Sequence, residues 1–165
     1  MAEKKQNLSE VDYFLVPGVN NFKVGILVSE WNQDITDSLK QGAVNSLIAS
    51  GVPSSSIKVE YVPGSFELPT AAVMMLEADD TLDAIICLGC IIQGETRHFE
   101  FIAQAVANGI TQVGLDYNTP VIFGVLTCNT MQQAEDRAGG KHGNKGVEAA
   151  ISCLKMLVLE RKLKK

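Results

Sequence analysis

The chain has 165 residues, the usual length of a single domain, and its hydrophobic fraction of 46% excludes a disordered protein. The net charge of −5 argues against nucleic acid as a partner, because a phosphate backbone binds to basic surfaces. A membrane partner is not expected either, since the longest apolar run, at residues 84–92, is too short to cross a bilayer.

Strand and helix patterns alternate along the chain. Short apolar and β-branched runs predict strands, and apolar residues at helical spacing predict helices. The predicted elements are, in chain order, a strand at residues 22–28, a helix at 34–50, a strand at 57–62, a helix at 70–78, a strand at 83–89, a helix at 96–115, a strand at 120–127, and helices at 131–138 and 146–162.

This alternation is typical of right-handed βαβ units, which build a parallel sheet. Because the strands are almost entirely apolar, both faces of the sheet are expected to be covered by helices. We therefore predict an α/β fold, a three-layer α/β/α sandwich of flavodoxin-like type with a four-stranded parallel sheet. In such sheets ligands bind beyond the carboxyl ends of the strands.

Two aromatic residues fall in the loops that follow the first two strands. Trp31 and Phe66 both lie among polar residues, where a flat heteroaromatic ligand could stack on them. The alternative is that each ring covers the rim of the core.

A histidine opens the helix predicted after the third strand. An imidazole at His98 can transfer protons near neutral pH, and the free N–H groups of a helix start can bind an anion. The alternative is a capped surface helix, with Thr96 as the N-cap and an idle imidazole.

A glycine-rich segment lies between the last two helices, at residues 138–146. Its glycines let a ligand approach the backbone, and Arg137, Lys141 and Lys145 supply positive charge. It is not a phosphate-binding P-loop, because no GxxxxGK[ST] pattern follows a strand. The alternative is a helix–helix connector.

Cys87 and Cys90 form a CxxC pattern, which suggests a redox or zinc site. We reject both, because an offset of three along a strand sends the two side chains to opposite faces. The four cysteines are expected to be small buried hydrophobic residues of a reduced, cytoplasmic protein. Residues 1–10 are too polar for a secretory signal and predict a mobile tail before one domain at residues 11–165.

Three segments taken together resemble the lumazine synthase family. They are PGSFELP at residues 63–69, GCIIQGETRHFEFI at 89–102 and FGVLTCNTMQQAEDRAGGKHGNKG at 123–146. The resemblance implies a transferase of riboflavin biosynthesis, 6,7-dimethyl-8-ribityllumazine synthase, which condenses 5-amino-6-(D-ribitylamino)uracil with 3,4-dihydroxy-2-butanone 4-phosphate and releases phosphate and water. It implies no metal and no organic cofactor. The alternative is a non-catalytic flavin- or lumazine-binding protein or storage shell.

The resemblance also implies roles for individual residues. His98 matches the proton carrier, and Arg137 matches the residue that holds the phosphate. Trp31 matches the aromatic residue that stacks on the pyrimidine. The remaining substrate-binding residues are Ser65, Phe66, Glu67, Ile91, Ile92, Gly94, Glu95, Thr96, Phe123 and Lys145. Of these thirteen residues, Phe123, Arg137 and Lys145 are expected to reach the site from a neighbouring subunit.

Finally, the resemblance implies a homo-oligomer. Pentamers with active sites between subunits are expected. The connector at residues 139–143 carries no insertion, which in this family is compatible with a 60-subunit icosahedral shell of twelve pentamers. Riboflavin synthase is a further partner that the resemblance suggests.

Overall fold

A four-stranded parallel sheet forms the centre of the computed structural model, which describes residues 18–164. The tail predicted at residues 1–10 lies outside these residues. The strand order is β2–β1–β3–β4. The strands are β1 (Val24–Ser29), β2 (Ile57–Val62), β3 (Ala84–Ile92) and β4 (Val121–Cys128).

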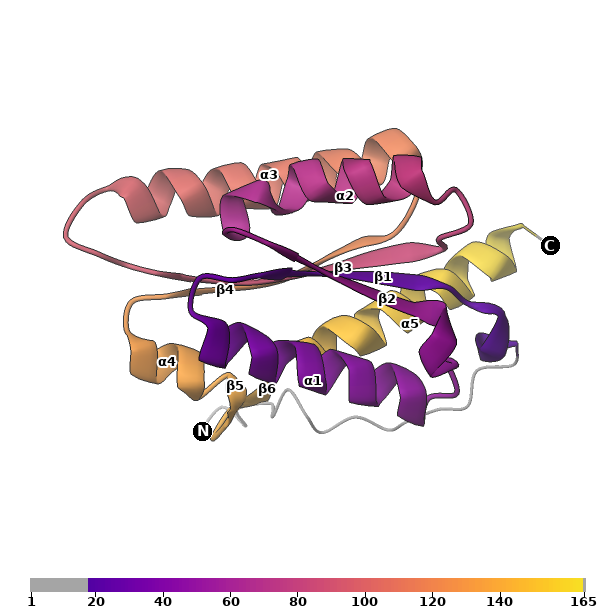
Figure 1. Ribbon diagram of the computed structural model, residues 1–165, viewed down its shortest axis with the longest axis horizontal. Helices are drawn as coiled ribbons and strands as arrows, with labels where there is room; N and C mark the ends of the chain where they lie inside the picture. Colours follow the sequence, from indigo (N-terminus) through magenta and orange to yellow (C-terminus); the bar gives the residue numbers. More distant parts are fainter. Residues whose placement is uncertain (1–17, 165) are drawn as a thin grey trace, which may run out of the picture.

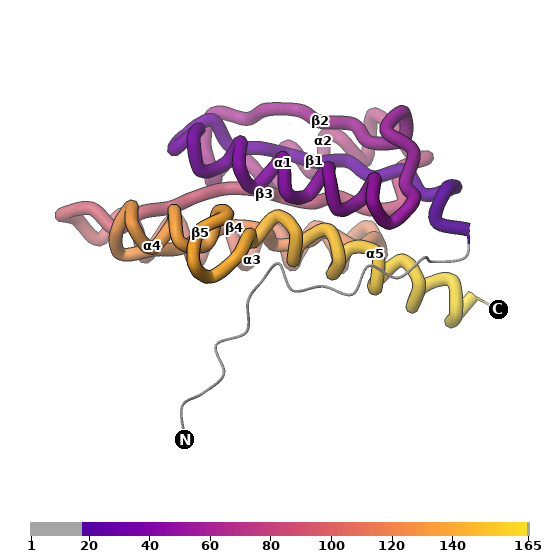
Figure 2. Tube along the Cα trace, turned by 90° about the horizontal axis from the view of Figure 1, so that it is seen from below, coloured from indigo at the N-terminus to yellow at the C-terminus, as the bar shows by residue number. Residues whose placement is uncertain are grey.

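Helices cover both faces of this sheet (Figure 1). One face carries α2 (Leu68–Ala78) and α3 (His98–Tyr117). The other carries α1 (Gln33–Ala49), α4 (Met131–Glu135) and α5 (Lys145–Leu163), and Figure 2 shows α1 and α5 side by side on it. Short 3-10 turns occupy Val19–Asn21, Ser54–Ser56 and Ser65–Glu67. This arrangement confirms the predicted three-layer α/β/α sandwich with a four-stranded parallel sheet.

The sheet separates two hydrophobic cores. Ile26 and Ile86 point to the side of α1 and α5, whereas Leu27, Ile85 and Cys87 point to the side of α2 and α3. The strands β1, β3 and β4 therefore supply apolar side chains to both layers, which is why they are apolar without alternation, whereas the edge strand β2 alternates with the exposed residues Lys58 and Glu60.

The two cysteines of the CxxC pattern contribute to opposite cores. Cys87 packs with the α2–α3 core and Cys90 with the α1–α5 core, so the prediction that the two side chains lie on opposite faces of the sheet is confirmed. Burial raises the pKa of each of these two thiols to about 12. Both thiols are therefore protonated and unreactive at neutral pH.

The glycine-rich segment between the last two helices differs from the prediction. The helix expected at residues 131–138 ends at Glu135, and a small antiparallel hairpin follows, made of β5 (Ala138–Gly140) and β6 (Gly143–Asn144). Gly139 and Gly143 adopt φ values of 118° and 83°, which favour glycine. The connector is thus a structured turn, and its backbone directs the chain into α5.

Two residues hold the start of α5 close to α1: Asn144 through its hydrogen bonds, and Gly146 because it has no side chain. The Oδ1 atom of Asn144 accepts a hydrogen bond of 2.8 Å from the Gly146 N–H, and its Nδ2 atom donates one of 3.0 Å to the Ser38 carbonyl. At Gly146 the two helices come so close that an added Cβ atom would lie 1.8 Å from the Leu39 carbonyl oxygen. Only glycine permits this crossing.

We expect Gly146→Ala to lower the free energy of unfolding by about 3 kcal/mol or more, because backbone blocks the new methyl group and α5 must move away from α1. The better helix propensity of alanine, worth about 1 kcal/mol, does not offset this loss. Urea denaturation measures the difference. Gly94→Ala is the control, since a Cβ atom there meets nothing within 4 Å, and an equal stability of the two variants would contradict the crossing geometry.

Candidate active site

Three loops leave the same edge of the sheet, at the carboxyl ends of β1, β2 and β3. The backbone joins two of them, since the Glu30 N–H donates a hydrogen bond of 2.8 Å to the Val62 carbonyl. Together with the first turn of α3 the loops surround a hollow of about 650 Å³. Its lining residues are Trp31, Asn32, Gly64, Ser65, Phe66, Glu67, Cys90, Ile91, Ile92, Gly94, Thr96, His98, Phe99 and Ile102.

Two exposed aromatic side chains stand at this hollow. Trp31 is 73% exposed and Phe66 is 55% exposed, and neither packs into the two hydrophobic cores. A Cβ atom added to Gly64 would lie 3.3 Å from Cδ1 of Trp31, so the indole lies close to the backbone of the second loop. Both rings therefore offer apolar surface to a flat ligand, and the reading that they cover the core rim is not supported.

The apolar floor of the hollow comes from the end of β3. Ile91 and Ile92 are half-buried there, beside the 3-10 turn that carries the buried residue Ser65. An added Cβ atom on Gly89 would lie only 2.5 Å from the Ser65 hydroxyl oxygen. Because Gly89 has no side chain, the Ser65 side chain fits against it, and the second loop can pack closely on β3.

The fourth wall of the hollow is the start of α3. The helix begins at His98, after Arg97, which forms no side-chain cap. Thr96 is therefore not at the N-cap, although its hydroxyl oxygen accepts a long hydrogen bond of 3.4 Å from the His98 N–H. Space is open in front of Gly94, where an added Cβ atom meets no atom within 4 Å. An anion can approach the backbone there, near the positive end of a 20-residue helix.

The lining of the hollow carries few charged side chains. Among the described residues the hollow contains the carboxylate of Glu67 and the imidazole of His98, but no lysine or arginine. Glu95 lies between two lining residues and does not itself line the hollow. The hollow of one chain thus supplies backbone N–H groups for an anion and no permanent positive charge.

Three of the predicted site residues lie elsewhere in the chain. Phe123 is in the middle of β4, paired with Cys87, and is 36% exposed. The Arg137 guanidinium donates a hydrogen bond of 3.0 Å to the Gln133 carbonyl, and Lys145 forms a 2.8 Å ion pair with Glu148. A single chain therefore brings nine of the thirteen predicted residues to the hollow, but not Glu95 or these three.

Five lining residues were not among the predicted site residues. They are Asn32, Gly64, Cys90, Phe99 and Ile102. Phe99 and Ile102 fit the apolar spacing of the helix, a pattern that indicates a core position rather than a site residue. Asn32 directly follows Trp31, and an asparagine just before a helix often adopts an unusual backbone conformation, which was the available signal.

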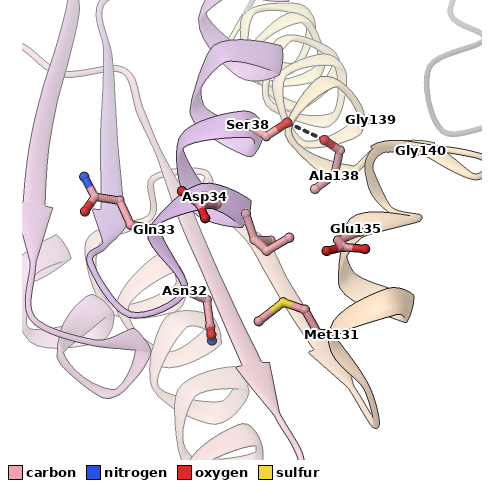
Figure 3. A pocket seen from close by; sticks show the side chains of 10 residues that line it. Asn32, Gln33, Asp34, Ser38, Met131, Glu135, Ala138, Gly139 and Gly140 are labelled. Atoms are coloured by element: carbon pink, nitrogen blue, oxygen red, sulfur yellow. Dashed lines mark hydrogen bonds between the residues drawn. The ribbon is translucent and has the colours of Figure 1, made fainter.

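A second hollow has a volume of about 580 Å³ and shares Asn32 with the first; Figure 3 shows the residues that line it. The first turns of α1, helix α4 and the β5 strand line it, with the carboxylates of Asp34 and Glu135. The Ser38 hydroxyl closes one side with a hydrogen bond to the Ala138 carbonyl. In residues 18–164 we find no group of three or more potential metal ligands. Nor does any helix of this region have the length and apolarity needed to span a bilayer.

A family model and several relatives that match this chain carry the same name. The model of the 6,7-dimethyl-8-ribityllumazine synthase family matches residues 21–161. A protein of that name from Porphyromonas gingivalis is 51% identical over 98% of this chain and 99% of its own length. A second, from Cytophaga hutchinsonii, is 56% identical over 95% of this chain and 98% of its own. A third, from Parabacteroides distasonis, is 50% identical over 95% of this chain and 98% of its own length.

Proposed function

The chain belongs to the 6,7-dimethyl-8-ribityllumazine synthase family, and we propose that the hollow at the carboxyl edge of its sheet is where this product forms. The chain is a transferase of riboflavin biosynthesis. It condenses 5-amino-6-(D-ribitylamino)uracil with 3,4-dihydroxy-2-butanone 4-phosphate and releases phosphate and water. One observation carries the assignment of the site: two exposed aromatic rings and a histidine at a helix start line the same hollow.

The pyrimidine ring lies between the aromatic walls in this proposal. Trp31 stacks on one face of the ring, and Phe66 closes the other side. Ile91 and Ile92 form the apolar floor, which is supported by their half-buried position in the lining. The polar groups of the second loop, Ser65 and Glu67, hold the ring edge and the ribityl hydroxyls.

The phosphate of the second substrate binds at the start of α3. Backbone N–H groups of Gly94, Glu95 and Thr96 cradle it, which the open space in front of Gly94 supports. A dianion also needs a cation, and the part of the lining that belongs to residues 18–164 of one chain contains no lysine or arginine. We therefore infer that Arg137 of a neighbouring copy grips the phosphate, while Phe123 and Lys145 of that copy complete the wall.

The chemistry then follows from these contacts. The amine of the pyrimidine attacks the ketone of the butanone, and loss of water gives an imine. Phosphate leaves, and the ring closes with loss of a second water. His98 carries protons in these steps, as an imidazole does near neutral pH, and Arg137 holds the leaving phosphate. Holding two substrates in register supplies a further part of the rate.

We propose that five copies form the working unit, as the family resemblance implies, and that a neighbouring copy delivers the cation that the described lining of the hollow lacks. The short connector is compatible with a shell of twelve such pentamers. Sedimentation separates the two forms: a pentamer has a mass of about 90 kDa and a shell of sixty chains about 1 MDa, from a chain of 17.8 kDa. Four free buried cysteines support a cytoplasmic location, where riboflavin synthase would be the enzyme that uses the product.

The experiment that tests this function is a condensation assay with both substrates. Lumazine absorbance and free phosphate are followed together, and we expect equal molar amounts of the two products. The competing interpretation is a storage protein that binds flavins or lumazines without turnover. It predicts quenching of the Trp31 fluorescence by these ligands but no lumazine above the uncatalysed rate, and that result would refute the enzyme.

A further inference from the structure

The loop that carries Trp31 is held to the sheet at two points. Before the tryptophan, the Glu30 N–H donates its 2.8 Å hydrogen bond to Val62 on β2. After it, Nδ2 of Asn32 donates a 3.0 Å hydrogen bond to the carbonyl of Cys90 on β3, 58 residues further along the chain. Between these two anchors the indole itself is largely exposed.

The second anchor depends on the unusual backbone of Asn32. Its φ and ψ of 58° and 49° are left-handed, and Asn32 and Asn118 are the non-glycine residues with positive φ among residues 18–164. In this conformation the Asn32 carbonyl accepts hydrogen bonds from the Ile35 and Thr36 N–H groups and so starts α1. The side chain does not cap the helix, unlike those of many residues at this position, and reaches across to β3 instead.

The bond partner of Asn32 connects directly to the floor of the hollow. Cys90 immediately precedes Ile91 and Ile92 on β3, and all three line the hollow together with Trp31. Asn32 borders both hollows, and its side chain leaves the first turn of α1 in a different direction from those of Gln33 and Asp34 (Figure 3). One hydrogen bond therefore links the aromatic wall of the hollow to its apolar floor.

We propose that Asn32 is a positioning residue that fixes the Trp31 ring relative to the Ile91–Ile92 floor, so that the space between Trp31 and Phe66 accepts a flat pyrimidine. This inference rests on the proposed function for the identity of the ligand. That Asn32 restricts the motion of the Trp31 ring is a claim about the ligand-free protein and does not depend on that function. Glutamine or serine could not replace asparagine here, because the left-handed backbone favours asparagine, aspartate or glycine.

Asn32→Gly tests the proposal, because glycine keeps the left-handed backbone and removes only the side chain that donates the hydrogen bond to Cys90. Trp31 is the single tryptophan of the sequence, so time-resolved fluorescence anisotropy reports on this ring alone. Without substrate, we expect the fast component of the anisotropy decay to increase about twofold in amplitude. With substrates, we expect KM for the ribitylaminouracil to rise about fivefold, the effect of one ordinary hydrogen bond, with kcat nearly unchanged.

Asn118→Gly is the matched control. Asn118 has the same backbone conformation, at the end of α3, but it does not line the hollow. We expect its anisotropy decay and KM to equal those of the parent chain. Asn32→Asp is the second variant, because a carboxylate fits the same backbone but cannot donate to the Cys90 carbonyl, and it covers the case in which Asn32→Gly does not fold.

Unchanged anisotropy in a folded Asn32 variant would overturn the proposal. A loss of kcat with unchanged KM would overturn it too, since that pattern indicates a role in the chemistry rather than in positioning. If the parent chain makes no lumazine, the proposed function fails, and the anisotropy measurement still decides whether Asn32 holds the ring.

Discussion

His98→Ala is expected to lower kcat for lumazine formation by about 100-fold or more, the ordinary contribution of a positioned general acid–base. The imidazole lines the hollow at the start of α3, beside the open space in front of Gly94. Imine formation and both losses of water need a proton carrier there, and the lining offers Glu67 as its other titratable side chain besides the buried Cys90. Stopped-flow absorbance of the product measures the effect.

The control for this variant is the second histidine of the sequence. His142 lies in the turn of the β5–β6 hairpin and does not line the hollow. We expect His142→Ala to keep kcat within about twofold of the parent chain, because it removes no group that contacts substrate. Should His98→Ala retain most of its activity, the assignment of His98 as the proton carrier is wrong.

Arg137→Ala is expected to raise KM for the butanone phosphate about 100-fold, the cost of leaving a charged group without its partner. The reason is the absence of lysine and arginine from the described lining of the hollow, so that in our proposal Arg137 of another copy supplies the cation for the phosphate. KM for the ribitylaminouracil should change little, because that substrate carries no phosphate. Steady-state kinetics with each substrate varied in turn separates the two effects.

A nearby cation provides the comparison for this variant. Lys141 follows Arg137 closely in the chain, is exposed, and forms a 2.8 Å ion pair with Asp136. We expect Lys141→Ala to leave both KM values almost unchanged, since an exposed ion pair contributes little. Arg137→Lys keeps the charge but loses the bidentate contact. We therefore expect its KM for the butanone phosphate to lie between the values of Arg137→Ala and Lys141→Ala. Equal KM values for Arg137→Ala and the parent would exclude Arg137 from the phosphate site.

The layers of the fold could be predicted because their signals are local. Each central strand is a short apolar run, and helices with regular apolar spacing separate them, which is sufficient to indicate a parallel sheet. The β5–β6 hairpin was missed for the same reason, since strands of three and two residues are too short to show a periodicity. There, the positive φ values of Gly139 and Gly143 determine the structure.

The sequence predicts those residues of the hollow that directly follow the carboxyl ends of the strands. Trp31, Phe66 and His98 follow β1, β2 and β3, and parallel strands bring their carboxyl ends to one edge. The role of Asn32 could not be predicted, because it depends on a left-handed backbone and on a hydrogen bond to a residue far along the chain. The contribution that we propose for Arg137 depends on how copies assemble, which residue spacing does not reveal.

The central claim is that each working site combines His98 of one copy with Arg137 of its neighbour. Co-assembly of His98→Ala chains with Arg137→Ala chains tests it most directly, with lumazine formation measured for each variant alone and for the mixture. We predict that the mixture regains activity, because random mixing of equal amounts leaves roughly a quarter of the sites with both groups intact. A mixed oligomer as inactive as its two components would show that the two residues do not meet across a subunit boundary, and would contradict the account.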